Sequence, residues 1–479
     1  MRLLSPFFSL RAASSSLRSH TLYVFLVFIL LYLLLVQYAH MRCFRDPTSL
    51  FFDPSRGYLP AYSAYRAQQA NAFIDKANNG AQMPQFPKVQ KPENPGFCVG
   101  FASIAREEAR YFRTAVGTAL ADLSETERAD IHLILFIAHT DPNQHPAYSE
   151  QWLHELADTV LLYDPDEVDI EHIKELETEQ ARISGREKGL FDYTYLLKAC
   201  YTVNASYVVM LEDDIVALDG WYHRTRNALD TAERQTGAMG ASKCESSPPF
   251  SYSEKNFKHS LVLLYLSQLT ERNSGLYLRL FYTEEFLGWN TEEWPIYLFC
   301  SAAVIATVAV LLLGTRHYLP PTRRFLANET ILLFCGVCTP LLIALFFAAG
   351  RVTMLPIPAG VHDMPRFGCC SQGLVFPRSR VPDLVAWFES RRIGYVDMLT
   401  EEYADRNGEI RWALTPSVLQ HVGRKSSKAD DFTTRPDRYH LSVAERLWNF
   451  AFETNDAAAL HLEHEHELAK AKASRVDFP

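Results

Sequence analysis

The sequence predicts an α/β fold with a mostly parallel sheet, joined to a membrane by an amino-terminal anchor and an inserted helical hairpin. Two observations support this prediction. From residue 96 onward, apolar runs typical of buried strands alternate with segments of helical pattern, which is the order of an α/β protein. In addition, three uncharged runs are long enough to span a hydrocarbon core of about 30 Å.

Length and composition limit the classes of function. The 479 residues suffice for one large catalytic domain with extra segments, or for two modest domains. The net charge of -9 argues against a nucleic-acid partner, because phosphate binding needs a concentrated basic surface and none is visible. The mean hydropathy of -0.10 conceals the three dense apolar runs.

The three apolar runs lie at residues 21–39, 294–315 and 330–350. The first is longer than the apolar part of a cleaved signal peptide, which is about 7 to 15 residues, so we expect a retained transmembrane anchor. The other two are expected to form a transmembrane hairpin over residues 294–350. Buried core helices are the alternative for this pair, but such helices normally keep a polar face.

Basic residues set the expected orientation of the spans. They precede the first span and fill the loop of the hairpin, at Arg2, Arg11, Arg18, Arg316, Arg323 and Arg324. Residues 1–20 are therefore expected to be a cytoplasmic tail, and both large segments outside the spans are expected to be lumenal. The lumenal glycosylation sequon at Asn204 directly precedes a predicted buried strand and could stay unused.

The lumenal residues divide into four parts. Residues 40–95 are rich in proline around a helix at 62–77 and are expected to be a stem. Residues 96–293 and 351–443 are expected to form the catalytic domain, and residues 444–479 a charged tail. The histidines of the tail could bind a metal ion, although a solvated helix is the commoner meaning of such a run. They are His461, His464 and His466.

The catalytic domain shows a regular alternation. Strands are expected at 97–105, 131–140, 157–163 and 206–214, and helices at 106–123, 151–157 and 190–200. A helix at 381–391 and a final strand leading to His421 follow the hairpin. Loops at the carboxyl ends of the strands are expected to form the site. Five lumenal cysteines permit disulfides of unknown pairing: Cys98, Cys200, Cys244, Cys369 and Cys370.

An acidic motif marks the carboxyl end of one buried strand, where Glu212, Asp213 and Asp214 follow four apolar residues. Carboxylate oxygens suit a hard divalent cation such as Mn²⁺ or Mg²⁺. Such a cation bridges the phosphates of a nucleotide diphosphate and neutralises the charge of the leaving group. Three acids in a loop are more often solvated charge, but the apolar residues on both sides favour a functional motif.

Four blocks carry a resemblance to a known family: SYVVMLEDDIVAL, LYLRLFYTEEFLGWNTEEW, the two late spans and TPSVLQHVGRKSS. They resemble the post-GPI-attachment GalNAc transferase family over about residues 96–427. The resemblance implies a GT-A-type fold interrupted by a transmembrane hairpin, acting on the glycan of glycosylphosphatidylinositol (GPI) anchors in the Golgi. A fainter similarity, through SIAREEARYF, LEDDI and QHVG, is to the N-acetylglucosaminyltransferase IV group, which has only its anchor.

The resemblance also implies roles for single residues. Glu212 and Asp214 match the outer members of a DxD-type metal motif, with Asp213 between them beside the donor. His421 resembles the late histidine that completes the metal or diphosphate site, and a structural histidine is the alternative.

Two further groups would contact the donor. Ser103, Arg106 and Glu107 follow the first strand, where this fold meets the base and ribose, although Arg106 could equally cap a helix surface. Lys188 and Asp192 resemble the segment that contacts the donor sugar and diphosphate. An ordinary ion pair between positions four apart in a helix is the alternative.

An inverting enzyme also needs a general base for the acceptor hydroxyl. The candidates after the hairpin are Asp397, Glu401 and Glu402, of which Asp397 is favoured. Residues 367–373 are expected to shape the acceptor pocket.

The expected function is therefore metal-dependent transfer of a sugar from a UDP-sugar, GalNAc by resemblance, to the mannose core of a GPI anchor in the Golgi lumen. The alternatives are an N-glycan N-acetylglucosaminyltransferase, a galactosyltransferase, or a non-catalytic lumenal receptor or tether. A small transporter is disfavoured, because the three spans carry no internal charge.

Overall fold

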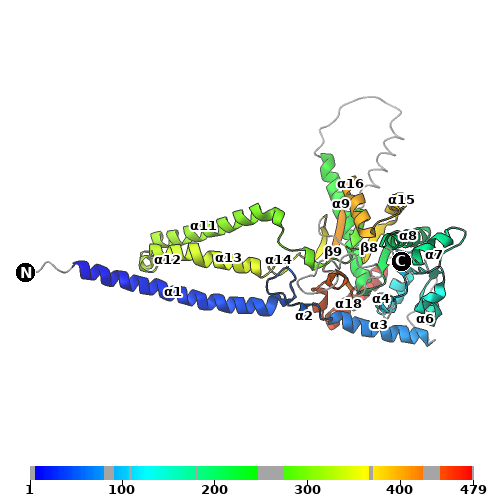
Figure 1. The fold of residues 1–479 in the computed structure, drawn as a ribbon, viewed down its shortest axis with the longest axis horizontal. Helices are drawn as coiled ribbons and strands as arrows, with labels where there is room; N and C mark the ends of the chain where they lie inside the picture. The colour runs from blue at the N-terminus through cyan, green and yellow to red at the C-terminus, as the bar shows by residue number, and fades with distance from the viewer. Residues whose placement is uncertain are drawn as a thin grey trace, which may run out of the picture. The chain divides into compact units, whose positions relative to one another are not determined.

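The computed structural model describes residues 6–79, 91–106, 110–178, 182–245, 275–365, 370–423 and 443–476 (Figure 1). The chain divides into two compact units. The first comprises Met1–Leu59 and Glu284–Ile357, and the second comprises Pro60–Thr283 and Pro358–Pro479. The second unit is thus continued after an insertion that belongs to the first.

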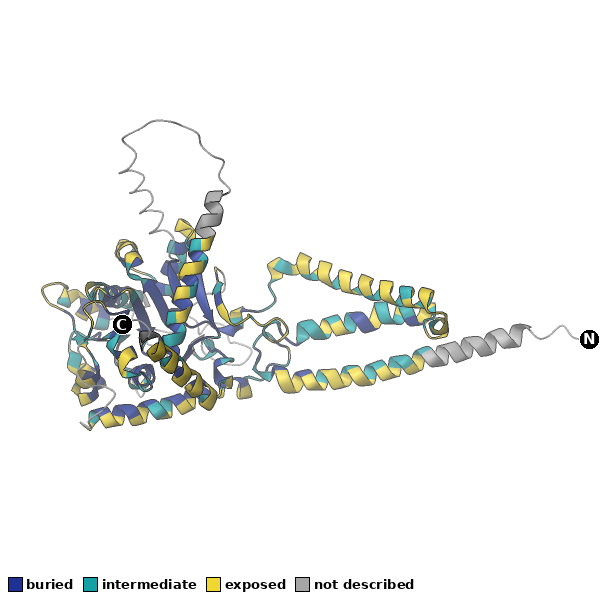
Figure 2. Cartoon of the chain, turned by 180° about the vertical axis from the view of Figure 1, so that it is seen from behind, coloured by how far each residue is buried: buried dark blue, intermediate teal, exposed yellow. Residues whose placement is uncertain are grey.

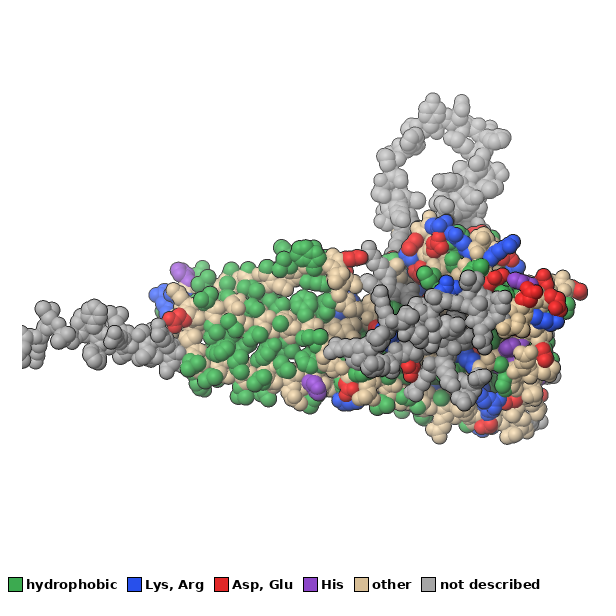
Figure 3. Space-filling view, in the orientation of Figure 1, with side chains coloured by type: hydrophobic (Ala, Val, Ile, Leu, Met, Phe, Trp, Pro, Cys, Tyr) green, Lys and Arg blue, Asp and Glu red, His purple; other side chains and the backbone are tan. Residues whose placement is uncertain are grey.

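The first unit holds three helices that are long and apolar enough to cross a membrane, as the sequence predicts. They are the segments Thr21–Arg45, Glu284–Tyr318 and Asn328–Ala348, built from α1 (Pro6–Arg42), α11 (Trp294–Tyr318), α12 (Asn328–Leu333) and α13 (Thr339–Ala348). Hydrophobic side chains follow these helices in the space-filling view (Figure 3). A π-helical turn, Phe334–Cys338, widens the last span just before Pro340, which lacks the N–H that an α-helix needs.

The segment that follows α1 binds the carboxyl-terminal end of α13. The backbone N–H of Leu50 and the hydroxyl of Ser49 both donate to the carbonyl of Ala348, at 2.8 and 3.0 Å. The indole of Trp289 donates to the carbonyl of Phe347 at 3.0 Å. Because the last carbonyls of a helix have no partner within the helix, these bonds complete α13 and join the anchor to the hairpin.

The second unit is built on an eight-stranded sheet with the order β3-β2-β1-β4-β8-β6-β9-β7. Its strands are β1 (Phe97–Ser103), β2 (Ile131–Ile137), β3 (Thr159–Leu161), β4 (Tyr207–Glu212), β6 (Tyr277–Arg279), β7 (Gly360–Asp363), β8 (Gly373–Pro377) and β9 (Arg411–Thr415). Strands β3, β2, β1 and β4 are parallel to one another, and β6 is parallel to β9, whereas the pairs β4–β8, β8–β6 and β9–β7 are antiparallel. The predicted α/β class with a mostly parallel sheet is confirmed.

Both faces of the sheet are covered, which explains why its central strands are almost continuously apolar. Phe97, Val99 and Phe101 of β1 enter one core cluster, and Cys98 enters the other, because successive side chains of a strand point to opposite faces. The burial of the strands contrasts with the exposed surface of α11 (Figure 2).

The helices of the second unit line these two clusters. Those with residues in the first cluster include α3 (Tyr62–Asn78), α4 (Tyr111–Leu120), α6 (Gln151–Leu156), α9 (Trp221–Glu245) and α18 (Ala457–Val476), and those in the second include α7 (Ile170–Thr178), α8 (Arg182–Thr202), α15 (Val381–Arg391) and α16 (Val396–Asn407).

Helix α3 lies within the segment that the sequence marks as a stem, yet it contributes to the core. Ala70 and Ile74 of α3 are fully buried. They lie so close to Gly117 of α4 that a side chain at Gly117 would start 2.8 Å from the Ala70 methyl group. The glycine therefore permits the two helices to approach closely, and the folded unit begins well before residue 96.

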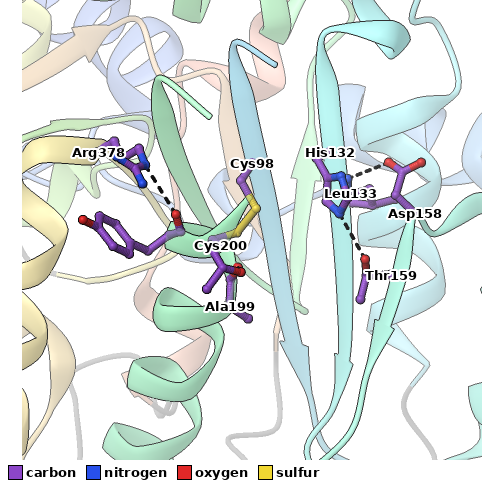
Figure 4. Close-up of a disulfide and its surroundings, with 10 residues drawn as sticks. Cys98, His132, Leu133, Asp158, Thr159, Ala199, Cys200 and Arg378 are labelled. Atoms are coloured by element: carbon purple, nitrogen blue, oxygen red, sulfur yellow. Dashed lines mark hydrogen bonds between the residues drawn. A yellow bond between two sulfur atoms is a disulfide. The ribbon is translucent and has the colours of Figure 1, made fainter. Parts of the chain in front are cut away.

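One described disulfide crosses the second core cluster. Cys98 of β1 is bonded to Cys200 of α8, and both side chains are buried (Figure 4). Cys370 is also disulfide-bonded. The Cys98–Cys200 bond links residues 102 positions apart and so constrains a long loop of the unfolded chain.

We expect the double variant Cys98→Ala with Cys200→Ala to lose about 2–5 kcal/mol of unfolding free energy, because the unfolded chain regains the entropy of a loop of about 100 residues. Urea unfolding of the purified protein measures this loss. Cys300→Ala is the control, since Cys300 is free and exposed. A double variant as stable as Cys300→Ala would contradict the expectation.

Candidate active site

The acidic motif lies at the carboxyl edge of the sheet, next to the end of β1. Because β1 and β4 are parallel neighbours with Ala102 opposite Glu212, the residues that follow them leave the sheet at the same edge. The hydroxyl of Ser103 donates to Oδ2 of Asp213 at 2.6 Å. Asp213 and Asp214 are both buried, so their charges need compensation from the protein or from a ligand.

A short second sheet brings His421 to Asp214. Strand β5 (Ile215–Ala217) pairs antiparallel with β10 (Leu419–His421), and this register sets His421 opposite Ile215. Nε2 of His421 then lies 3.5 Å from Oδ2 of Asp214. Nδ1 of His421 donates to the carbonyl of Leu447 at 3.0 Å, since a carbonyl can only accept. This bond orients the ring with Nε2 toward the carboxylate.

The glycine of the His421-Val-Gly sequence is required by the same contact. A Cβ atom at Gly423 would lie 2.3 Å from Oδ2 of Asp214 and 2.9 Å from Nε2 of His421. No side chain fits there without moving one of these two groups.

Arg106 supplies positive charge to the motif. Its guanidinium donates to Oδ2 of Asp214 at 2.9 Å and also forms an ion pair with Asp213. Glu212 accepts a hydrogen bond from the hydroxyl of Ser371. Each of the three carboxylates therefore has a partner from a different part of the chain.

Burial and charge shift the pKa values of these groups in different directions. Burial raises the pKa of Asp213 above its ordinary value, and the opposing effect of Arg106 does not cancel it. Burial acts likewise on Asp214, but His421 and Arg106 outweigh it and hold the pKa of Asp214 well below its ordinary value. Burial lowers the pKa of His421, but Asp214, Glu212 and the carbonyl of Leu447 together outweigh burial and raise it.

Three polar atoms around the motif are buried without a hydrogen-bond partner among the described residues. They are Oδ1 of Asp214, Oε1 of Gln372 and the hydroxyl of Tyr193. Gln372 adjoins the motif through its carbonyl, which accepts from the N–H of Glu212 at 3.2 Å. Buried polar atoms are normally paired, so such a group indicates a missing ion, water or ligand. The carboxylates of Glu212 and Asp214, the latter with its unpartnered Oδ1, and the oriented imidazole of His421 are suitable ligands for a divalent cation.

A pocket opens beside Asp213. Its lining includes Ser103, Arg106, Tyr111, Phe112, His145 and Asp213. The N–H of Ala147 donates to Nδ1 of His145 at 3.2 Å, so Nε2 carries the hydrogen and donates to Ser103 at 3.0 Å. Burial, together with His139 and Arg110, lowers the pKa of His145 to about 4. The neutral histidine thus orients Ser103 toward Asp213.

The remaining residues singled out from the sequence are more dispersed. Glu107 lies outside the described residues. Lys188 and Asp192 form a buried ion pair of 2.9 Å, in which Lys188 also donates to the carbonyl of Ala138 and to Tyr163. The ion pair expected as the alternative is thus present, and donor contact by these two residues stays a prediction.

Of the three candidate bases, Asp397 is joined to the acidic motif through one short segment. Its Oδ2 accepts from the N–H of Cys370 at 3.2 Å, and the next residue, Ser371, binds Glu212. Glu401 instead forms ion pairs with Arg279 and Arg411, at 2.9 and 2.8 Å.

Glu402 forms ion pairs with Arg391 and Arg406, at 2.9 and 2.6 Å. Its carboxylate is therefore already compensated by two guanidinium groups, as that of Glu401 is. Gly373, at the end of the predicted pocket segment, is explained by packing, because a Cβ atom there would lie 2.2 Å from Leu419.

Comparison with known proteins supports one distant relationship. The chain is 27% identical, over 146 residues, to the alpha-1,3-mannosyl-glycoprotein 4-beta-N-acetylglucosaminyltransferase B of Danio rerio. The match covers 27% of this chain and 25% of that protein. No protein-family model matches the chain. The chain is thus distantly similar to a glycosyltransferase.

Sequence reasoning missed His145, Tyr193 and the part played by Ser371. His145 lies in the loop HTDPNQHPAY after β2, and the polar residues at that strand end were the available signal. Tyr193 lies in the segment GREKGLFDYTY, where the charged residues give the stronger sequence signal.

We expect Gly423→Ala to lower the unfolding free energy by about 1–3 kcal/mol, because its Cβ overpacks against Asp214 and His421. Gly237→Ala is the control, since nothing lies within 4 Å of a Cβ atom at that helical position. Urea unfolding compares the two variants. Equal stability of Gly423→Ala and the parent protein would refute the close contact.

The low pKa of His145 predicts a pH dependence of stability. The folded pKa is about 4 and the ordinary value 6.5, so the unfolded state binds more protons between these values. The contribution of His145 is therefore complete above about pH 6.5 and declines as the pH falls toward 4. His145→Asn is expected to show a smaller loss of unfolding free energy between pH 7 and pH 5 than the parent protein. Identical losses would argue against a buried neutral histidine.

Proposed function

We propose that the protein is a metal-dependent glycosyltransferase that moves GalNAc from UDP-GalNAc to the mannose core of a GPI anchor in the Golgi lumen. The observation that carries this proposal is the group formed by Asp214, with its unpartnered Oδ1, and His421, whose Nε2 is oriented toward it. The distant similarity to a glycosyltransferase supports the reaction class.

In this proposal Glu212, Asp214 and His421 hold a Mn²⁺ or Mg²⁺ ion. The bound cation supplies charge compensation for the diphosphate when the sugar–oxygen bond breaks. His421 would bind in its neutral form through Nε2, because its Nδ1 hydrogen is held by the carbonyl of Leu447. Arg106 contacts Asp213 and Asp214, and in this proposal its guanidinium would bind a donor phosphate instead.

The pocket beside Asp213 is the proposed position of the uridine. Ser103, Asp213 and Arg106 contribute hydrogen-bonding groups to the pocket, and Tyr111 and Phe112 contribute aromatic surface. His145 supports Ser103 from behind and is itself buried. A nucleoside needs this combination of an apolar face and a few oriented polar groups.

On the acceptor side we favour Asp397 as the general base. Glu401 and Glu402 are each engaged by two arginines, so their carboxylates are already occupied by ion pairs. Asp397 is partly exposed and bears no ion pair among the described contacts, and the segment from Cys370 to Gln372 connects it to Glu212. Asp397 would accept the proton of the attacking hydroxyl as the new glycosidic bond forms.

The proposed lumenal location and the proposed acceptor rest on other observations. Three candidate spans favour a membrane protein, and the Cys98–Cys200 disulfide is typical of an oxidising compartment such as the secretory lumen. GPI and GalNAc follow from the resemblance of the sequence blocks. The similar protein from Danio rerio is named for transfer of N-acetylglucosamine to a mannosyl glycoprotein, so that donor and acceptor are included in the test.

We expect Asp214→Asn to lower transfer by about 100-fold or more, because the variant loses a carboxylate ligand of the cation that would compensate the leaving diphosphate. Initial rates at saturating Mn²⁺ measure the effect. Asp166→Asn is the matched control, since Asp166 is exposed and remote in sequence from the motif. Full activity of Asp214→Asn in a correctly folded protein would exclude the assigned metal site.

The decisive experiment is a donor screen with the full chain in detergent. UDP-GalNAc, UDP-GlcNAc and UDP-galactose are each offered with a GPI glycolipid and with a mannose-terminated N-glycan, and the products are identified by mass spectrometry. Transfer of GalNAc to the GPI glycolipid is expected. Another donor or acceptor would redirect the assignment within glycosyltransferases, whereas no metal-dependent binding of any UDP-sugar would favour a tether.

A further inference from the structure

A second cluster of metal-binding side chains is formed by three helices far apart in the sequence. Glu127 lies in α5 (Glu125–Ala129), His223 in α9 and His464 in α18. Each side chain offers one ligand atom, and these atoms all lie within 4.8 Å of one another. None of these residues belongs to the acidic motif or to the pocket beside it.

His464 is held in the orientation that a metal ligand requires. Its side chain is only 3% exposed, although it lies in the charged run HLEHEHELAK. Nδ1 lies 2.6 Å from Oδ1 of Asp219, which accepts its hydrogen. Nε2 therefore faces Glu127, at 3.1 and 3.2 Å from its two carboxylate oxygens. A carboxylate on the far nitrogen is the usual support of a metal-bound histidine.

His223 has the same two-sided arrangement. Its Nε2 lies 3.4 Å from Oε1 of Glu463, and Arg224 fixes that carboxylate with bonds of 2.8 and 2.6 Å. Nδ1 is buried and has no hydrogen-bond partner among the described residues. Gly220 makes room for the ring, because a Cβ atom there would lie 2.3 Å from Cε1 of His223. A buried imidazole nitrogen without a partner indicates a missing ligand.

One carboxylate oxygen of Glu127 is fixed by Ser124, and the other faces His464. Its Oε2 accepts from the N–H and the hydroxyl of Ser124, both at 2.9 Å, in a capping box at the start of α5. Its Oε1 lies 3.2 Å from Nε2 of His464. Zinc bonds of about 2.0–2.1 Å in tetrahedral geometry separate neighbouring ligand atoms by about 3.3 Å. The three ligand atoms lie within 4.8 Å of one another, so shifts of the side chains would bring them to this spacing.

We propose that Glu127, His223 and His464 bind a zinc ion that fastens the carboxyl-terminal helix α18 to α5 and α9. Two imidazoles and one carboxylate favour zinc over Mg²⁺ or Mn²⁺, which prefer sites made mostly of oxygen. Water completes the tetrahedron. The alternative to zinc is a hydrogen bond in which Nε2 of His464 donates its proton to Glu127. The zinc site stands independently of the proposed sugar transfer.

Zinc content of the full chain tests the proposal. The protein is purified in detergent through a tag without histidine, incubated with ZnSO₄, freed of excess metal and analysed by mass spectrometry of the metal. We expect about one zinc ion per chain, and we expect His223→Gln to lose it. This variant removes one ligand but leaves the buried contacts of His464 with Asp219 and Glu127 intact. His466→Gln should keep the zinc, because this neighbour on α18 is 79% exposed.

Asp214→Asn should also keep the zinc, which separates this site from the acidic motif. Co²⁺ provides a second measurement on the parent protein, where a tetrahedral visible absorption spectrum that zinc abolishes is expected. A parent protein without bound zinc, retention of zinc in His223→Gln, or a Co²⁺ spectrum typical of six-coordination would each overturn the proposal.

Discussion

The burial of consecutive carboxylates at the end of β4 is the constraint around which the second unit is organised. Glu212, Asp213 and Asp214 are adjacent, and the latter two are almost fully removed from water. Like charges this close cannot remain in a protein interior without compensation, since desolvation and mutual repulsion both oppose ionisation. Burial keeps the pKa of Asp213 raised, whereas His421 and Arg106 outweigh burial at Asp214 and lower its pKa.

Compensation comes from residues that only the fold assembles. Ser103 and Arg106 follow the parallel neighbour β1, Ser371 precedes β8, and His421 ends β10. Each reaches the motif because a strand pairing sets its position. The pairing of β5 with β10 has the largest consequence, because it brings residues 215 and 421 into register across the whole membrane insertion.

The insertion is compatible with the sheet because of where the chain leaves and returns. It departs after β6 and re-enters at β7, and both strands pair with β9. The two ends therefore lie one strand apart, and the hairpin can be accommodated without separating the strands that hold the site. Tolerance of an insertion depends on such nearby ends rather than on the length of the inserted segment.

Much of the fold was predictable, since its signals are local. Strands buried on both faces are apolar throughout, as in SYVVML, and spans of membrane length carry no charge, so composition alone marks them. The position of the acidic motif at a strand end follows from the same pattern. The predicted helix at 106–123 was too long at its start, because α4 begins at Tyr111, and Arg106 turns back to the carboxylates instead of extending the helix.

By itself, therefore, the sequence determined the α/β class, the three helices of membrane length and the chemistry available at the end of β4. The tertiary structure decided which distant groups meet: His421 with Asp214, and His145 with Ser103. It also distinguished His464, buried against Glu127 and Asp219, from His466 two residues later on the solvent side. The physical reason is that the local sequence pattern indicates which faces of a helix or strand are apolar. The partner of a buried polar atom instead depends on segments that are far away along the chain.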